Sequence, residues 1–461
     1  MVATLLGHSH LLYADDVTRL GTDNYTLETD PDTTGQSERV IISDPIDARR
    51  VLRQHPGKPA FPYQSIFIGS GLIGQTDLSL WRRQRRWMRP VFHFQEVRRH
   101  YPKVCNEARA MVMRLHEDSP SPSPIRTNVH AELLKTTFRM LGRVILNEHQ
   151  TSTRRWFDDA KSEELRQAFE DGLQPFYQTT PQGRTAHATL QEFATHVLQT
   201  GGTTSEAPVG DDVDATPDAT PTFTSRLLES GDASPYSSRQ LQVDELLTTA
   251  YAGHETTANT IAWCFYELAR HPRQQAQLRE AIRSACQRSG VVSPLQLSYA
   301  QLSAIDLLTG AVRETLRLWP VVANGPFRVT GDAGDAALGL APGTAFQTPH
   351  WVMHRNPAQW GSDASEFDMT RPLERGRWCE KAFMPFSVPP RDCVGRHVAM
   401  MEMRVLVATM VHHFRWDDRD PSDANNVSLH KRGRNWATLA PEDGLVVALH
   451  PVARAQEASR L

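Results

Sequence analysis

A single cysteine lies in a setting that favours a thiolate. Cys393 stands in the segment FSVPPRDCVGR, between a proline-rich loop and a predicted helix start. The helix dipole, the free N–H groups at the helix amino terminus and the nearby Arg391 would lower the pKa of the thiol. A thiolate can ligate haem iron, where it favours O–O cleavage. A buried structural cysteine is an equally good interpretation of this segment alone.

A second set of reactive side chains lies in AGHETT, in the middle of a long helical pattern. Gly253 costs roughly 1 kcal/mol in a helix interior, but the missing Cβ lets a flat ligand approach the backbone. Thr256 can bond back to the helix carbonyl four residues earlier, and the adjacent Glu255 could relay protons. An ordinary helix with a polar patch is the alternative. An HExxH zinc site is excluded, because Ala258 stands where the second histidine is required.

Two further pairs each share one helix face. Glu314 and Arg317 are three residues apart, a spacing typical of common surface ion pairs. Trp81 and Arg85 are four residues apart and could donate hydrogen bonds to the carboxylates of a bound ligand. A core tryptophan beside solvated arginines is the commoner arrangement.

Periodic apolar residues predict the helices that would position these side chains. They span 104–115, 133–146, 190–198, 244–271 and 304–318, and a last helix is predicted to begin just after Cys393 and run towards His413. Short apolar pairs with Gly and Pro between 321 and 348 predict small strands and turns. The fold class is therefore mainly α with a small β region.

The composition is that of an ordinary soluble globular protein. The 461 residues include 39% hydrophobic and 22% charged residues, and the net charge of −3 gives no reason to expect nucleic-acid binding. The stretch 201–222, rich in Gly, Pro, Thr and Asp, predicts a flexible acidic loop. We expect one domain over residues 1–461, because the motifs on both sides of this loop need each other.

Compartment and cross-linking can also be predicted. There is no secretory signal pattern and no run of about 20 apolar residues, so we expect a cytoplasmic protein without a membrane span. The cysteines are five in number, widely spaced and without CxxC pairs. A disulfide framework or zinc knuckle is therefore not expected.

The order of these motifs resembles the cytochrome P450 superfamily. WxxxR, AGxET, ExxR and FxxxxRxCxG follow one another at the separations typical of that family, and the pieces HRNP and FDMTR agree with it. The resemblance extends from about Arg50 to the last residues. It implies a triangular, mostly helical prism with haem between the long central helix and the helix after the cysteine loop.

The resemblance also implies roles for individual residues. Haem b (iron protoporphyrin IX) would be ligated through Cys393, with Phe386 packed near the sulfur. The residues that match propionate-binding positions are Trp81, Arg85, Arg328 and Arg391. Thr256 and Glu255 match the alcohol and the acid that deliver protons during oxygen activation. Glu314 and Arg317 would pair with Arg371 in a buried structural triad.

The expected reaction is O2 activation followed by oxidation, most simply hydroxylation, of a small and largely apolar organic substrate in specialised metabolism. Electrons would come from a ferredoxin and a ferredoxin reductase, because no flavin or reductase segment is present. One alternative is a haem-thiolate peroxygenase, isomerase, dehydratase or oxidative coupling enzyme. Another is a non-catalytic haem sensor, which would not need Glu255 and Thr256.

The cysteine loop departs from the family pattern at two positions. Ser387 and Pro389 stand where the family usually has glycines. Proline fixes φ near −65° and lacks an N–H group, so a backbone that requires positive φ at residue 389 could not form. We expect a locally altered approach to Cys393, with iron ligation retained.

Overall fold

The computed structural model describes residues 13–17, 22, 24–28, 38–59, 69–117, 124–146, 156–157, 159–173, 180–200, 222–229, 231, 233–417, 433–435 and 438–452. Of the acidic loop predicted at 201–222, only Thr222 lies within these residues. The chain divides into two compact units: residues 1–59, 104–137 and 255–461 form unit 1, and residues 60–103 and 138–254 form unit 2.

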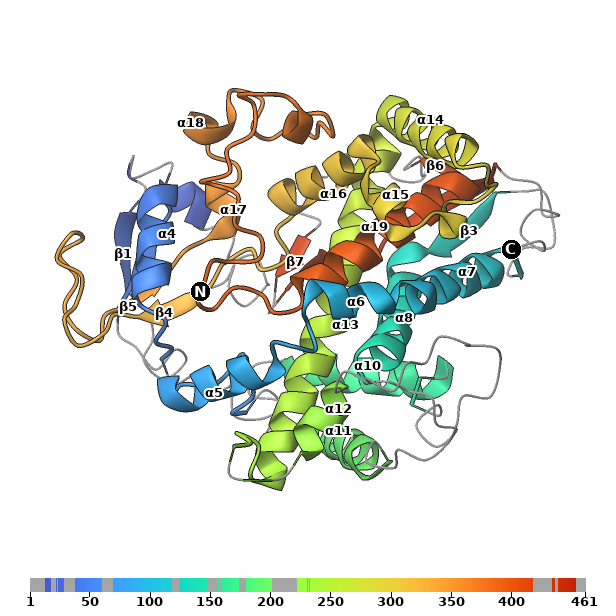
Figure 1. Cartoon of the computed structure of the whole chain (residues 1–461). Helices are drawn as coiled ribbons and strands as arrows, with labels where there is room; N and C mark the ends of the chain where they lie inside the picture. Colours follow the sequence, from blue (N-terminus) through green and yellow to red (C-terminus); the bar gives the residue numbers. More distant parts are fainter. Residues whose placement is uncertain are drawn as a thin grey trace. The chain divides into compact units, whose positions relative to one another are not determined.

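Most of the described residues are helical (Figure 1). The helices are α4 (Pro45–Gln54), α5 (Leu78–Met88), α6 (Phe94–Arg99), α7 (Tyr101–Glu117), α8 (Val129–Val144), α10 (Asp159–Leu173), α11 (Pro181–Thr200), α12 (Phe223–Leu228), α13 (Arg239–Arg270), α14 (Pro272–Arg288), α15 (Tyr299–Ser303), α16 (Asp306–Leu318), α17 (His350–Met353), α18 (Pro357–Trp360) and α19 (Arg396–His413). Two 3₁₀ turns are η2 (Pro294–Gln296) and η3 (Arg371–Leu373). The helices predicted from apolar periodicity are confirmed as α7, α8, α11, α13, α16 and α19.

The strands belong to unit 1. They are β1 (Asn24–Glu28), β2 (Glu38–Ile42), β3 (Ile125–Asn128), β4 (Phe327–Val329), β5 (Ala345–Gln347), β6 (Phe414–Asp417), β7 (Gly433–Asn435), β8 (Leu439–Pro441) and β9 (Val446–Pro451). They pair in the orders β1-β2-β5-β4, β3-β9-β6 and β7-β8. Among the strands that the structure describes, only β2 and β5 run parallel, with Val40 opposite Phe346. β4 and β5 confirm the small strands predicted between residues 321 and 348.

Helix α4 joins the first sheet to the cysteine loop. The Asp44 side chain caps α4 by accepting hydrogen bonds from the amides of Ile46 and Asp47, both at 2.9 Å. The apolar face of α4 is buried in a cluster that includes residues of β2, of β5 and of the segment before Cys393. Its members are Ile42, Ala48, Val51, Leu52, Phe346, Met353, Met384 and Val388. Val388 therefore anchors the cysteine loop in the core of unit 1.

Helix α19 is the centre of the remaining helical packing in unit 1. It lies against α14, α15 and α16, and Figure 1 shows α19 (red) beside these helices (yellow). Its buried residues include Met401, Leu406 and Met410. A helix that is apolar on most sides is a core helix, so α19 gives the loop before it a rigid support.

Unit 2 is held together by aromatic side chains from α8, α11 and the segment between α8 and α10. Phe138 stacks on Phe157 with ring centroids 5.0 Å apart, and Trp156 meets Phe193 edge to face at 5.6 Å. Such pairs add to the stabilisation that burial of the rings supplies. Here α11 packs against both α10 and α12.

Two kinds of feature, a membrane-spanning helix and a group of metal ligands, are absent from the described residues. None of the described helices is both long enough and apolar enough to cross a bilayer. The described residues also contain no group of three His, Cys, Asp or Glu side chains that could hold a metal ion.

Candidate active site

The cysteine loop is a backbone-bonded turn that ends at α19. The amide of Ser387 donates to the carbonyl of Met384 at 2.9 Å, and the amide of Cys393 donates to the carbonyl of Phe386 at 2.8 Å. Gly395 then caps α19, so the predicted helix start after Cys393 is confirmed. Cys393 is exposed, whereas Cys105, Cys264 and Cys286 are buried and Cys379 is half-buried.

The positive φ in this loop is taken by a serine. Ser387 has φ of 58°, and Pro389 is joined to Pro390 by a cis peptide bond. A left-handed conformation costs an L-residue other than glycine about 1–2 kcal/mol. The turn therefore forms with serine at a position where the family usually has glycine, and it does not require positive φ at Pro389.

Three cations gather in unit 1. Arg328 lies buried on β4; its Nη1 donates to the carbonyl of Phe327 at 2.8 Å, and its Nε has no hydrogen-bond partner within the described part of the chain. Burial, and then the charge of Arg391, lower the pKa of Arg328 to about 9. Burial also lowers the pKa of Lys58 far below its usual range, with Arg328 and Arg391 adding to the effect. Both pKa values are lowered because burial and the neighbouring positive charges disfavour the protonated form of each side chain.

Sequence reasoning missed two residues of this cluster, Lys58 and His350. His350 begins α17, three residues after the end of β5, and both its ring nitrogens lack hydrogen-bond partners among the described residues. Burial, and then Arg328, lower the pKa of His350 to about 3. Its ring stacks on that of His354 with centroids 5.5 Å apart. Neither residue belongs to a motif. The sequence feature that could have indicated His350 is a polar residue three positions after a buried strand.

This arrangement fits an anionic cofactor held by a thiolate. Buried positive charge is costly unless it is paired, and the two carboxylates of a haem would be favourable partners for buried Arg328 and Arg391 and for half-buried Lys58. Cys393 supplies an accessible sulfur at the start of a core helix. The residues that are present therefore fit the group that the motifs predict.

Glu255 and Thr256 lie next to each other on α13, and both are half-buried. The Glu255 carboxylate accepts a hydrogen bond from the hydroxyl of Thr438 at 2.7 Å. The carbonyl of Thr256 accepts one from the hydroxyl of Thr260 at 2.8 Å. Thr438 precedes β8, and no sequence motif marks it.

The neighbouring residues of α13 belong to unit 2. A Cβ at Gly253 would meet Cδ1 of Leu141 at 2.7 Å, so in this structure a leucine side chain makes the close approach. The His254 imidazole bonds to the carbonyl of Ala250 at 2.7 Å and meets Phe138 edge to face at 5.2 Å. Burial lowers the pKa of His254 to about 4. His254 is therefore a neutral core residue.

Trp81 and Arg85 also lie in unit 2, on α5. Asp77 caps this helix by accepting hydrogen bonds from the amides of Ser79 and Leu80 at 2.7 and 3.1 Å. Trp81 is buried and Arg85 is half-buried. Their shared face on the helix agrees with the spacing, and their roles towards haem remain predictions.

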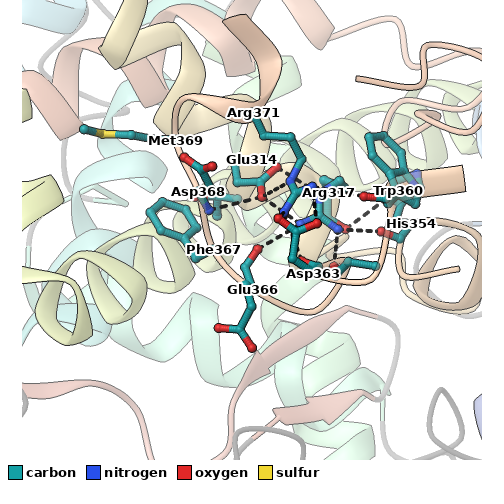
Figure 2. Close-up of polar contacts among 12 residues, drawn as sticks. Glu314, Arg317, His354, Trp360, Asp363, Glu366, Phe367, Asp368, Met369 and Arg371 are labelled. Carbon is teal, nitrogen blue, oxygen red and sulfur yellow. Dashed lines mark hydrogen bonds and ion pairs between the residues drawn. The ribbon is translucent and has the colours of Figure 1, made fainter. Parts of the chain in front are cut away.

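The buried triad is confirmed within unit 1. Arg317 makes two hydrogen bonds to the carboxylate of Glu314, at 2.8 and 2.7 Å, and Arg371 adds a third at 3.1 Å. Figure 2 shows the two guanidinium groups converging on Glu314. Arg317 also donates to the carbonyls of His354, Ala364 and Glu366 at 2.8, 2.5 and 3.1 Å. The triad thus ties α16 to the segment that leads towards the cysteine loop.

Comparisons with known proteins identify the family of the chain. A family model described as Cytochrome P450 matches residues 33–436. A cytokinin hydroxylase from Arabidopsis thaliana is 33% identical over 175 residues, which are 38% of this chain and 33% of that protein. Cytochrome P450 monooxygenase sphH from Aspergillus fumigatus is 30% identical over 216 residues, 46% of this chain and 39% of that protein. Cytochrome P450 4F4 from Rattus norvegicus is 26% identical over 401 residues, 81% of this chain and 74% of that protein. The first two alignments cover less than half of those relatives.

Proposed function

Because the chain belongs to the cytochrome P450 family, we propose that it is a haem-thiolate monooxygenase that hydroxylates a small, largely apolar organic molecule. The observation that carries this proposal is the group of cations formed by buried Arg328 and Arg391 and half-buried Lys58, in the same unit as an exposed Cys393. The relatives named as a hydroxylase and a monooxygenase support the same reaction class. The chemistry that haem supplies when bound through a thiolate is oxygen activation.

The proposed roles of the chain's own residues follow from their positions. Cys393 Sγ would bind the iron, and the hydrogen bond from the Cys393 amide to the Phe386 carbonyl fixes the loop that carries this cysteine. Arg328, Arg391, Trp81 and Arg85 would bind the propionates. The Glu255 carboxyl group and the Thr256 hydroxyl move protons towards the reacting oxygen, which requires hydrogen-bond reach, directly or through one water.

We further propose an acidic ferredoxin, served by its reductase, as the electron donor. Helices α5 and α6 and the turn between them carry a run of exposed arginines in unit 2: Arg82, Arg83, Arg86, Arg89, Arg98 and Arg99. Complementary charge raises association rates and makes them fall with salt. Reversing Arg82 and Arg86 to Glu should slow reduction by a ferredoxin at low ionic strength and leave reduction by dithionite unchanged. Equal ferredoxin rates for both proteins would contradict this surface.

The experiment that tests the proposed function is the reduced, carbon monoxide-bound spectrum of the haem-loaded protein. The wild type should show the red-shifted Soret band of thiolate ligation, and Cys393→Ser should lose it. Cys379→Ser is the matched control: Cys379 is the other cysteine that is not fully buried, and this variant should keep the band. A protein that takes up no haem, or a Cys393→Ser variant with the wild-type band, would overturn the proposal.

A further inference from the structure

A line of hydrogen bonds runs through the interior of unit 1 and ends on Glu255. The His130 ring nitrogen Nε2 lies 2.6 Å from Oδ1 of Asn259. Nδ2 of Asn259 donates to the hydroxyl of Thr438 at 3.0 Å, and that hydroxyl donates to Oε1 of Glu255 at 2.7 Å. His130, Asn259 and Thr438 are all buried.

The direction of every proton in this line follows from the end at Glu255. The Thr438 hydroxyl has a single proton, and it donates that proton to Oε1 of Glu255. Thr438 must therefore accept its other bond from the amide NH2 of Asn259. The Asn259 carbonyl then faces His130, whose Nε2 must carry a proton. All the donors point towards the carboxylate.

The position of Thr438 is fixed by hydrogen bonds of the next residue, Leu439, through its amide and its carbonyl. The amide of Leu439 donates to the carbonyl of Val321 at 2.7 Å. The carbonyl of Leu439 accepts from the indole of Trp263 at 3.0 Å. Trp263 lies two turns after Glu255 on α13 and stacks on Trp319 with ring centroids 3.8 Å apart. The residue after Thr438 is thus bonded to the same helix that carries Glu255.

We propose that Thr438 is a positioning residue for Glu255, and that Asn259 and His130 hold the Thr438 hydroxyl in its donating orientation. The proposal rests on the acid role of Glu255 in the proposed function. A carboxylate on a half-buried helix face has several rotamers, and one fixed donor selects among them. Selection of a single rotamer fixes the position of the acid relative to the next residue, Thr256, and proton transfer demands well-defined geometry.

The catalytic test uses the haem-loaded protein, hydrogen peroxide as oxidant and guaiacol as the reporter, across pH. Thr438→Val keeps the shape and removes the hydroxyl. It should lower the rate about tenfold, as loss of a hydrogen bond to a charged group predicts, and should change the pH profile. Thr438→Ser should stay within about twofold of wild type. Thr409→Val removes an equally buried hydroxyl that bonds to the Val405 carbonyl at 2.7 Å, and it should leave the rate unchanged.

A double-mutant cycle separates positioning from general damage. In a Glu255→Gln background, Thr438→Val should have little further effect, because its target is already altered. Equal losses in both backgrounds, or a wild-type rate and pH profile for Thr438→Val, would overturn the proposal.

A second readout does not depend on turnover. In protein labelled with ¹⁵N-histidine, the His130 ring should show a proton on Nε2, and Asn259→Leu should release this tautomer. A proton on Nδ1 in the wild type would overturn the proposal. If the protein takes up no haem, the proposed function fails, whereas the labelled His130 still decides whether the line of hydrogen bonds exists.

Discussion

Arg371 and Glu314 lie 57 residues apart in the sequence, and their side chains meet at 3.1 Å in the interior of unit 1. Both side chains are almost completely inaccessible, at 1% and 0% exposure. Arg371 also reaches the backbone carbonyls of Trp360 and Asp363, both at 3.0 Å. One guanidinium group therefore closes the segment between α18 and η3 onto α16.

Removing Arg371 should destabilise the protein strongly. Arg371→Ala leaves the Glu314 carboxylate buried with one cation fewer, and such a loss costs about 3–5 kcal/mol. Urea denaturation followed by circular dichroism measures the change. The control is Arg283→Ala, which breaks an exposed pair with Glu280 and should give no measurable change. Equal stability of the Arg371 and Arg283 variants would contradict the structural role of the triad.

The strained serine of the cysteine loop gives a prediction of the opposite sign. Ser387→Gly removes the conformational cost of positive φ, and the greater freedom of glycine in the unfolded chain offsets part of the gain. We expect stabilisation of up to about 1 kcal/mol, seen as a higher midpoint of thermal unfolding. Ser387→Val should destabilise the protein, because a β-branched residue tolerates this conformation poorly. Destabilisation by glycine would show that the serine hydroxyl matters more than the backbone.

Glu245 should make unit 2 less stable as pH rises. It is buried on α13 and accepts a hydrogen bond from the amide of Leu72 at 2.8 Å, and burial raises its pKa from 4.5 to about 7. Between these two values the folded state keeps a proton that the unfolded state has lost. Its contribution is therefore complete below pH 4.5 and is lost as pH rises through 7, by roughly 2 to 3 kcal/mol between pH 5 and pH 8.

The variant Glu245→Gln isolates this effect. The unfolding free energies of wild type and variant, measured in urea at pH 5 and pH 8, should differ more at pH 8 than at pH 5. Relative to the variant, the wild type should lose stability at pH 8. A parallel pH dependence of the two proteins would show that Glu245 titrates normally.

His413 should act in the opposite direction in unit 1. Its ring is buried, neither ring nitrogen has a hydrogen-bond partner among the described residues, and burial lowers its pKa from 6.5 to about 3. Here the unfolded state gains the proton first, so stability is complete above pH 6.5 and is lost as pH falls towards 3. The expected loss between pH 7.5 and pH 5 is about 2 kcal/mol. His413→Phe should remove this loss; acid sensitivity equal to that of the wild type would contradict the prediction.

Local patterns were sufficient to predict six of the described helices (α7, α8, α11, α13, α16 and α19) and the order of the motifs. Apolar periodicity predicted α13 and α16 because their buried faces repeat along the sequence, and the ExxR spacing placed Glu314 and Arg317 on one face. Contacts between distant segments leave no such pattern. The hydrogen bond between Thr438 and Glu255 joins residues that are 183 positions apart in the sequence. Lys58, Arg328 and Arg391 are likewise distant in the sequence and come close only in the folded protein. Positive φ occurs at Ser387. Steric preferences alone would have predicted a glycine at a position with this backbone conformation.

The three carbonyl bonds of Arg317 bear on how the chain acquires its structure. The segment from His354 to Glu366 wraps around a side chain that precedes it in the sequence. During synthesis from the amino terminus, α16 leaves the ribosome first. The Arg317 guanidinium group is therefore made before the carbonyls to which it donates. A nascent chain that stops short of residue 366 lacks one or more of these carbonyls, so this set of hydrogen bonds can be completed only after residue 366 has been synthesised.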